Sequence, residues 1–346
     1  MNILIVTDAW SPQVNGVVRT LQSVRAELEQ MGHRVEVISP DQFHSLPCPT
    51  YPEIRLALTA SVGKRIEEAA PDAIHVATEG PLGLAARRYC MKQELPFTTA
   101  YHTQFPDYVS KRTKLPARWF WRYIRWFHAS SKAVMVSTPT VERQLHANGI
   151  AHTRHWGRGV DLSLFTVAGQ RHPAFDSLQQ PIMLYVGRVA VEKNIEAFLD
   201  VRHPGTKVVV GDGPALETLK TRFPDIRFLG KLTGPDLAAA YRSADVFVFP
   251  SRTDTFGLVL IEALATGTPV AAYPVQGPID VLTDAVACMD EDLDRAIAQA
   301  LTRDRAVCAE YAGHFGWSES ARQFLEGLVP IWRETEAGPA NQLASA

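Results

Sequence analysis

Charged side chains in the second half of the chain have the types and spacing that suit binding and transfer of a phosphate-linked group. Asp254 and Glu262 lie eight positions apart, the first before a predicted helix and the second inside it. Gly257 lies near the start of this helix, where free backbone N–H groups and the helix dipole favour an anion. Arg188 and Lys193 follow a predicted strand. Fixed cations of this kind could stabilise a departing diphosphate without a metal ion.

Each of these features also has an ordinary structural interpretation. Asp254 or Thr255 could serve only as a helix N-cap, and Glu262 could be a surface residue. Arg188 and Lys193 could be solvated surface cations, which is the usual state of such residues. The spacing alone leaves both interpretations open.

Four further segments attract attention, and all but Arg158–Asp161 follow a predicted strand. Asp8–Arg19 contains Gly16, which would let the backbone approach a diphosphate closely, although a plain loop-to-helix turn is the alternative. Tyr101-His102-Thr103 places a histidine after a strand, although a lone histidine is more often a core or capping residue. Arg158–Asp161 reads RGVD. Gly211–Pro214 is weak evidence, because the third glycine of a dinucleotide fingerprint is missing.

The elements that must position these residues alternate between short apolar runs and helical patterns. In the first helix Val17, Leu21, Val24 and Leu28 share one face, and Gly32 follows as a stop signal. The predicted strands are 2–7, 34–39, 73–77, 97–100 and 133–137, and then, in a second series, 182–186, 207–210, 226–229, 246–249 and 270–272. Such alternation gives parallel sheets that bind ligands at the carboxyl ends of their strands.

The length of 346 residues suits two α/β domains. A polar stretch at residues 166–180 predicts the boundary. We expect an N-terminal Rossmann-like domain over residues 1–168 and a C-terminal one over 169–315. In the last segment, 316–346, a helix from about Ser318 to Arg333 would cross back onto the first domain before a frayed tail. The predicted fold class is therefore α/β, with two doubly wound domains facing a cleft.

Composition narrows the class of protein further. Hydrophobic residues make up 46% and charged residues 21%, which supports a globular core. The net charge of -2 gives no global signal for binding nucleic acid. Cys48, Cys90, Cys288 and Cys308 form no CxxC pair, which indicates reduced thiols in a cytoplasmic protein. No apolar run has the length of a membrane span, and the N-terminus lacks the basic leader of a signal peptide.

The segment Pro250–Ala272, PSRTDTFGLVLIEALATGTPVAA, resembles the signature of glycosyltransferase family 4, which is an E-x7-E motif followed by an A-x-G-x-P-V turn. Asp254 stands where the family usually has glutamate, which shortens the arm and keeps the charge. Tyr185–Ile195 resembles the family's G-R-x5-K-N/G loop, and Arg158–Phe165 resembles its N/R-G-V-D-x3-F segment. The resemblance covers about residues 2–333.

The resemblance implies a GT-B fold, with two Rossmann-like domains facing a cleft. It implies retaining, metal-independent transfer of a hexosyl group from a nucleotide-diphosphate sugar, with no cofactor. The similar subgroup includes mannosyltransferases that use GDP-mannose and lipid glycosyltransferases. GDP-mannose or a UDP-sugar is therefore the expected donor, and a membrane lipid is a candidate acceptor.

The resemblance also implies roles for individual residues. Asp254 would contact the donor sugar, and Glu262 would hold the ribose hydroxyls. His102 would lie near the reacting sugar, and Arg158 would face the cleft. The residues expected to contact the phosphates or the base are Gly16, Arg188, Lys193, Gly211, Lys231, Leu232, Phe256, Gly257 and Leu258.

Three other functional classes fit the sequence less well. A metal-dependent transferase needs acidic ligands, and the nearest candidate, Asp290-Glu291-Asp292, suits helix-start charge better. An NAD(P)-dependent oxidoreductase would carry GxGxxG after the first strand, where Thr7–Gly16 has none. A non-catalytic, two-domain sugar-binding protein would normally carry an export signal and would not need the Arg188 and Lys193 pair.

A basic and aromatic segment, Lys111–His128, suggests contact with an anionic membrane surface. Its predicted helix, Ala117–His128, places three arginines on one stripe (Arg118, Arg122 and Arg125) among seven aromatic or apolar residues, and Lys111, Arg112 and Lys114 lie just upstream. Aromatic side chains beside a basic stripe suit a membrane interface. An ordinary helix with aromatic core residues is the alternative, and both apply in part if only the loop and one end of the helix touch lipid. We therefore expect a cytoplasmic protein that can associate peripherally with the inner face of the membrane.

Overall fold

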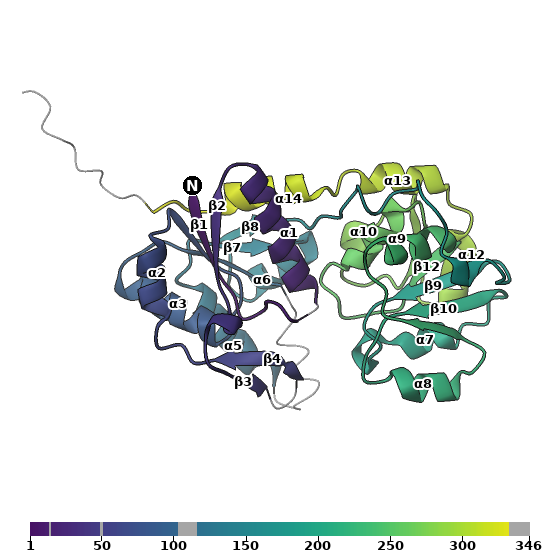
Figure 1. Cartoon of the computed structure of the whole chain (residues 1–346), viewed down its shortest axis with the longest axis horizontal. Coiled ribbons are helices and arrows are strands. Elements are labelled where there is room, and N and C mark those ends of the chain that lie inside the picture. The colour runs from purple at the N-terminus through teal and green to yellow at the C-terminus, as the bar shows by residue number, and fades with distance from the viewer. Residues whose placement is uncertain (14, 49–50, 103–115, 332–346) are drawn as a thin grey trace, which may run out of the picture.

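The computed structural model describes residues 1–13, 15–48, 51–102 and 116–331. These residues form two lobes that lie side by side (Figure 1), each built on a six-stranded parallel sheet. The strand order is β2-β1-β5-β6-β7-β8 in the first lobe and β11-β10-β9-β12-β13-β14 in the second. Two parallel sheets with covering helices confirm the α/β fold that strand–helix alternation predicted.

The first lobe holds the N-terminal series of elements. Its sheet consists of β1 (Asn2–Val6), β2 (Arg34–Ile38), β5 (Ala73–Val76), β6 (Thr98–Ala100), β7 (Ala133–Val136) and β8 (Thr153–His155). Its helices are α1 (Gly16–Gln30), η1 (Pro40–Gln42), α2 (Val62–Ala69), α3 (Pro81–Lys92), α5 (Ala117–His128) and α6 (Pro139–Ala147), and β3 (Ser45–Cys48) pairs with β4 (Tyr51–Ala57). The central strands are buried on both faces, as parallel strands between two helix layers must be.

The second lobe repeats this plan. Its strands are β9 (Ile182–Val186), β10 (Thr206–Val210), β11 (Arg227–Gly230), β12 (Val246–Phe249), β13 (Val270–Ala272) and β14 (Ala287–Met289). Its helices are η2 (Pro173–Phe175), η3 (Val191–Lys193), α7 (Ile195–Leu199), α8 (Leu216–Arg222), α9 (Gly234–Ser243), α10 (Leu258–Ala265), α11 (Pro278–Val281), α12 (Leu293–Ala300) and α13 (Arg305–Ala312). The apolar side chains of β9 and β12 supply the core on both sides of the sheet.

Helix α1 shows how local sequence sets an element of the site. The side chain of Asn15 accepts a hydrogen bond from the Val18 N–H at 3.0 Å, which caps the first turn. Leu21, Val24 and Leu28 are fully buried against the first sheet, as the predicted stripe requires. Gly32 has a φ of +85°, so the predicted stop lies just beyond the helix end.

The chain crosses back to the first lobe through α14 (Trp317–Gly327), which lies against α1 (Figure 1). The indole N–H of Trp156 donates to the Ser320 hydroxyl at 3.1 Å. The predicted extent, from Ser318 to Arg333, was wrong at its end, because the helix stops at Gly327 and Arg333 lies outside the described residues. Pro330 instead bridges Ala73 of β5, and a proline cannot continue a helical hydrogen-bond ladder. The domain limits at residues 168 and 315 remain predictions.

Candidate active site

Loops at the carboxyl ends of the two sheets contact each other. The Thr255 hydroxyl, in the loop after β12, donates to the backbone carbonyl of His102 at 2.9 Å. His102 lies two residues beyond the end of β6. The Asp280 carboxylate of α11 accepts from both the N–H (3.1 Å) and the hydroxyl (2.8 Å) of Thr140 in α6. Ligands of doubly wound sheets bind at this edge. The loops that carry His102 and Thr255 therefore meet where the two lobes meet.

The glycines predicted to approach a diphosphate lie at this junction. Gly257 has a φ of +83° and begins α10, so the first N–H groups of that helix are available to an anion. A Cβ placed on Gly16 would lie 3.9 Å from Cδ1 of Leu258, across the lobes. The start of α1 and the start of α10 therefore approach each other. Phe256, which directly precedes Gly257 in the chain, is buried in the core of the second lobe.

Asp254 and Lys193 form an ion pair between neighbouring loops of the second lobe. Lys193 Nζ lies 2.5 Å from Asp254 Oδ1, and each side chain is roughly three-quarters buried, with 28% and 21% exposed. The other oxygen, Asp254 Oδ2, is shielded from solvent and has no hydrogen-bond partner among the described residues. Asp254, which was expected to contact the donor sugar, and Lys193, which was expected to contact the diphosphate, thus pair with each other. Asp254 does not cap α10, since Gly257 occupies the N-cap position without a side-chain cap.

Glu262 is buried, with 2% of its side chain exposed, so it is not the surface residue of the alternative interpretation. Its carboxylate accepts a hydrogen bond from the Tyr241 hydroxyl of α9 at 3.0 Å. It also forms an ion pair with Arg19, which comes from α1 in the other lobe. Burial and the Glu262 charge raise the pKa of Tyr241 well above its usual range. The buried Glu262 carboxylate therefore has a phenol on one side and a partly exposed cation, Arg19, on the other.

His102 and Arg158 form a second polar pair at the junction. Arg158 Nη2 lies 3.0 Å from His102 Nδ1, and the guanidinium also stacks on the Trp156 ring at 4.6 Å from its centroid. Burial lowers the pKa of Arg158 to about 9. Burial, followed by the charges of Arg158 and His75, holds the pKa of His102 well below its ordinary value. The imidazole is therefore neutral at physiological pH.

The remaining predicted residues lie near strand ends of the second lobe. Arg188 is exposed directly after β9. Gly211 follows β10 with a φ of +145°, and a Cβ there would lie 1.8 Å from the Gly187 carbonyl oxygen, so packing of the two loops requires the glycine. Lys231 is exposed and Leu232 half-buried after β11, two strands away from β9. Arg188 thus follows β9, a central strand that neighbours β12, whereas Lys231 and Leu232 follow β11, an outermost strand of the sheet.

Sequence reasoning missed two residues of the site, Arg19 and Tyr241. Arg19 belongs to the segment that contained Gly16, and its position one turn into α1 was the available signal. Tyr241 lies on α9 and carries no local signal. Only packing of α9 against α10 brings its hydroxyl to Glu262.

Helix α5 divides into a buried and an exposed face. Trp121, Ile124, Phe127 and His128 are buried. The exposed face consists of Arg118, Trp119, Arg122, Arg125 and Trp126. The core interpretation is therefore confirmed for the buried face, and contact of the exposed face with a membrane stays a prediction. The basic residues at 111, 112 and 114 lie outside the described residues.

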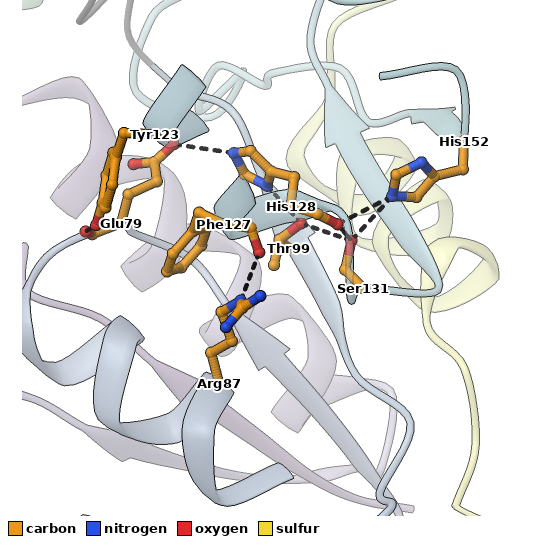
Figure 2. Close-up of polar contacts among 8 residues, drawn as sticks. All are labelled: Glu79, Arg87, Thr99, Tyr123, Phe127, His128, Ser131 and His152. Carbon is orange, nitrogen blue, oxygen red and sulfur yellow. Dashed lines mark hydrogen bonds and ion pairs between the residues drawn. The ribbon is translucent and has the colours of Figure 1, made fainter. Parts of the chain in front are cut away.

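A polar network fixes the C-terminal end of α5 to the first lobe (Figure 2). Arg87 donates to the carbonyls of Phe127 (2.9 Å) and Trp126 (3.0 Å), which satisfies two acceptors that the helix end leaves free. His128 joins Thr99 of β6 through Nδ1 at 2.8 Å and Glu79 through Nε2 at 3.3 Å. The C-terminal end of α5 is thus anchored to β6.

The acidic run considered as a metal site caps a helix. The Asp292 side chain accepts from the Asp294 N–H at 3.0 Å as the N-cap of α12, and Asp290 pairs with Arg295. Within the described ranges no group of three or more His, Cys, Asp or Glu side chains is arranged to hold a metal ion. No helix in the described part of the chain is long and apolar enough to cross a membrane.

Comparison with known proteins identifies the family. The profile of Glycosyltransferase Family 4 matches residues 14–164, and that of Glycosyl transferases group 1 matches residues 180–303. A GDP-mannose-dependent alpha-mannosyltransferase from Mycobacterium tuberculosis is 31% identical over 309 residues, which cover 82% of each chain. The chain belongs to glycosyltransferase family 4.

Other relatives of this glycosyltransferase differ in length and in named product. A sulfoquinovosyl transferase from Arabidopsis thaliana is 31% identical over 78% of this chain, which spans only 59% of that protein. An alpha-monoglucosyldiacylglycerol synthase from Streptococcus pneumoniae is 28% identical over 87% of this chain and 78% of its own. Sucrose-phosphate synthase from Thermosynechococcus elongatus has a TM-score of 0.72 at 19% identity, covering 94% of this chain and 97% of that one. The predicted GT-B fold is thereby confirmed.

Proposed function

We propose that this glycosyltransferase transfers a hexosyl group from GDP-mannose or a UDP-sugar to an acceptor hydroxyl with retention of configuration. The observation that carries the proposal is the meeting of Gly16 and His102 of the first lobe with the loop and helix that carry Asp254 and Glu262. The named activities of the mannosyltransferase and monoglucosyldiacylglycerol synthase relatives support these donor classes. The family assignment sets aside the oxidoreductase and the non-catalytic sugar-binding protein.

In the proposed complex the donor replaces contacts that the protein makes with itself. The ribose hydroxyls would donate to Glu262 in place of Arg19. The diphosphate would lie between the N-terminus of α10 and the cations Arg188 and Lys193, which frees Asp254 for the sugar. Charge-matched donors fixed in advance stabilise a leaving diphosphate strongly in a site that excludes water.

The proposed chemistry is a front-face displacement. The bond between the anomeric carbon and the diphosphate oxygen breaks, and the acceptor oxygen forms its bond on the same face. The acceptor proton passes to the leaving phosphate oxygen, so no protein carboxylate needs to act as nucleophile. Lys193 and Arg188 would balance the growing charge on the diphosphate.

We also propose that the acceptor is a membrane lipid and that the protein docks peripherally on anionic membrane. The exposed face of α5 supports this proposal, since 59% of Trp119 and 46% of Trp126 are exposed beside three arginines. Basic groups near an anionic surface contribute about 1 kcal/mol each. The diacylglycerol acceptor in the name of the pneumococcal relative agrees with a lipid substrate.

A donor screen tests the function. Purified protein is incubated with GDP-mannose, UDP-glucose or UDP-galactose, with liposomes containing diacylglycerol, and release of nucleotide diphosphate is measured. We expect one donor to be consumed, and we expect equal rates with and without EDTA, because cations of the protein replace the metal. Loss of turnover on chelation, restored by manganese, would refute metal independence. Failure of every donor to bind by calorimetry would refute the transferase proposal.

A further inference from the structure

The contact between Arg158 and Nδ1 of His102 determines which nitrogen of the imidazole ring carries the proton. The Nη2 atom of Arg158 lies 3.0 Å from Nδ1 of His102. A guanidinium has hydrogen-bond donors and no acceptor, so Nδ1 must accept with its lone pair. The proton of the neutral imidazole therefore resides on Nε2.

The guanidinium is itself held in a fixed plane. Its other terminal nitrogen, Nη1, donates to the carbonyls of Trp156 (2.9 Å) and Gly157 (3.3 Å). The Trp156 ring packs beneath it and is tethered by its indole N–H to Ser320 of α14. Only 7% of Arg158 is exposed, and no carboxylate of the described residues lies within ion-pair distance. The guanidinium of Arg158 thus contacts backbone carbonyls, the Trp156 ring and His102, and forms no salt bridge within the described residues.

The opposite nitrogen of His102 is left for a ligand. His102 Nε2 is shielded from solvent and has no hydrogen-bond partner among the described residues. The backbone of the same residue accepts from Thr255, next to Asp254 in the donor-side loop. A buried N–H without an acceptor is costly, so an oxygen atom of a ligand at the lobe junction would satisfy it.

We propose that Arg158 is a positioning residue that fixes His102 as the Nε2–H tautomer, so that His102 donates a hydrogen bond to an oxygen of the sugar nucleotide. The inference rests on the proposed function. It assigns His102 as a neutral hydrogen-bond donor and excludes it as the base that deprotonates the acceptor. The oxygen belongs either to the sugar or to the diphosphate.

Nuclear magnetic resonance of protein labelled with ¹⁵N in its 11 histidines tests the tautomer without any need for turnover. Loss of one set of signals in His102→Gln assigns the residue. We expect a protonated Nε2 and an unprotonated Nδ1 from pH 8 down to pH 5.5, because burial, followed by the charges of Arg158 and His75, holds the pKa of His102 well below its ordinary value. A proton on Nδ1 in the wild-type protein overturns the proposal.

Kinetics of two Arg158 variants test the function of the contact. Arg158→Met should lower kcat/KM about tenfold, and kcat of this variant should fall further below pH 6.5. Arg158→Lys, which retains a donor, should restore most of the loss. Arg154→Met is the matched control, since Arg154 donates to the carbonyls of Glu326 and Gly327 and does not touch His102. A pH profile of Arg158→Met that parallels the wild type, at normal thermal stability, overturns the positioning role.

Binding identifies the oxygen and separates this inference from the proposed function. If the sugar supplies it, Arg158→Met weakens calorimetric binding of the intact sugar nucleotide and leaves binding of the free nucleoside diphosphate unchanged. If the diphosphate supplies it, both weaken equally. If neither affinity changes while the donor still binds the wild type, His102 has no ligand oxygen and the proposal fails. If no sugar nucleotide binds the wild type, the proposed function fails, and with it the ligand role of His102.

Discussion

At the scale of single residues, the carboxylates proposed for the donor already hold cations of the protein. Lys193 pairs with Asp254, and Arg19 reaches from the other lobe to Glu262. Each carboxylate is thus oriented by a cation of the protein before a ligand arrives. Preorganised charges of this kind stabilise a transition state without reorganising during the reaction.

The two carboxylates should respond differently to neutralisation. Glu262→Gln should weaken binding of free nucleoside diphosphate, because the ribose hydroxyls lose a charged acceptor and keep only a neutral one. Asp254→Asn should lower kcat more than nucleotide affinity, because its place is beside the sugar. Calorimetry with the nucleoside diphosphate and steady-state kinetics measure the two effects. Much weaker nucleotide binding by Asp254→Asn than by Glu262→Gln would reverse the assignment.

Removing the diphosphate cations should affect rate more than folding. Arg188→Ala and Lys193→Ala should each reduce transition-state stabilisation by about 2–4 kcal/mol, which is typical for loss of a charge-matched donor. Circular dichroism should be unchanged, because neither side chain belongs to the apolar core of the second lobe. Lys220→Ala is the control, since Lys220 pairs with Glu217 on the outer helix α8. Near-normal kcat/KM in both loop variants would make Arg188 and Lys193 ordinary surface cations.

The sequence could predict the residues that belong to one continuous motif, and it could not predict their partners. Asp254, Gly257 and Glu262 lie on a single strand–loop–helix unit, whose geometry follows from local pattern. The contacts of Glu262 with Arg19 and Tyr241 join segments from opposite lobes and from two helices. Such contacts depend on tertiary packing, which spacing along the chain does not encode.

At the scale of elements, buried strands within the two strand–helix series were predicted from sequence. They include the five-residue strands β1 and β9 and the three-residue strands β6 and β13, as well as the amphipathic stripe of α1. The three-residue strands β8 and β14 were missed. Both are outermost strands of their sheets, where pairing on one side alone determines them.

Helix α5 offers a matched pair of tryptophans for testing membrane docking. Trp121 is buried and stacks on Tyr101 with ring centroids 6.0 Å apart, so Trp121→Ala should destabilise the protein by about 3–5 kcal/mol. Trp119 is 59% exposed, so Trp119→Ala should leave thermal stability nearly unchanged and should reduce binding to anionic liposomes. Cosedimentation at low and high salt measures the binding, and salt should weaken it.

The upstream basic residues provide a second arm of the same test. Replacing Lys111, Arg112 and Lys114 together with serine should abolish cosedimentation with anionic liposomes, because several favourable charges are lost at once. Wild-type protein that stays in the supernatant with anionic liposomes at low salt would contradict docking. The exposed face of α5 would then require another explanation.

At the scale of the whole molecule, the C-terminal helix ties the two lobes together. The Val160 N–H donates to the Phe315 carbonyl at 2.7 Å, so the chain segments that leave and re-enter the first lobe pair with each other. Phe324 of α14 then packs against His75 of β5 with ring centroids 4.9 Å apart. The first lobe is therefore completed by the last described helix of the chain.

This arrangement buries His75 completely and makes the first lobe sensitive to acid. Burial, together with the Arg158 charge, lowers the pKa of His75 to about 3. Below the ordinary histidine pKa of about 6.5, the unfolded chain binds a proton that the folded protein cannot accept. The stability contributed by neutral His75 is therefore complete at pH 7 and is lost progressively as the pH falls from about 6.5 towards 3.

Urea unfolding at pH 7.5 and pH 5 should reveal this loss. The linkage amounts to about 1.4 kcal/mol for each pH unit below 6.5, so His75 alone should lower the free energy of unfolding by about 2 kcal/mol at pH 5. His75→Leu should be less stable at pH 7.5, since Thr98 loses its hydrogen bond to Nδ1, but should lose correspondingly less between the two pH values. His44→Leu, which replaces an exposed imidazole in the same lobe, is the control. If wild type and His75→Leu lose equal stability on acidification, then His75 must take up its proton in the folded protein, and the packing of α14 over β5 must be loose enough to admit a charge.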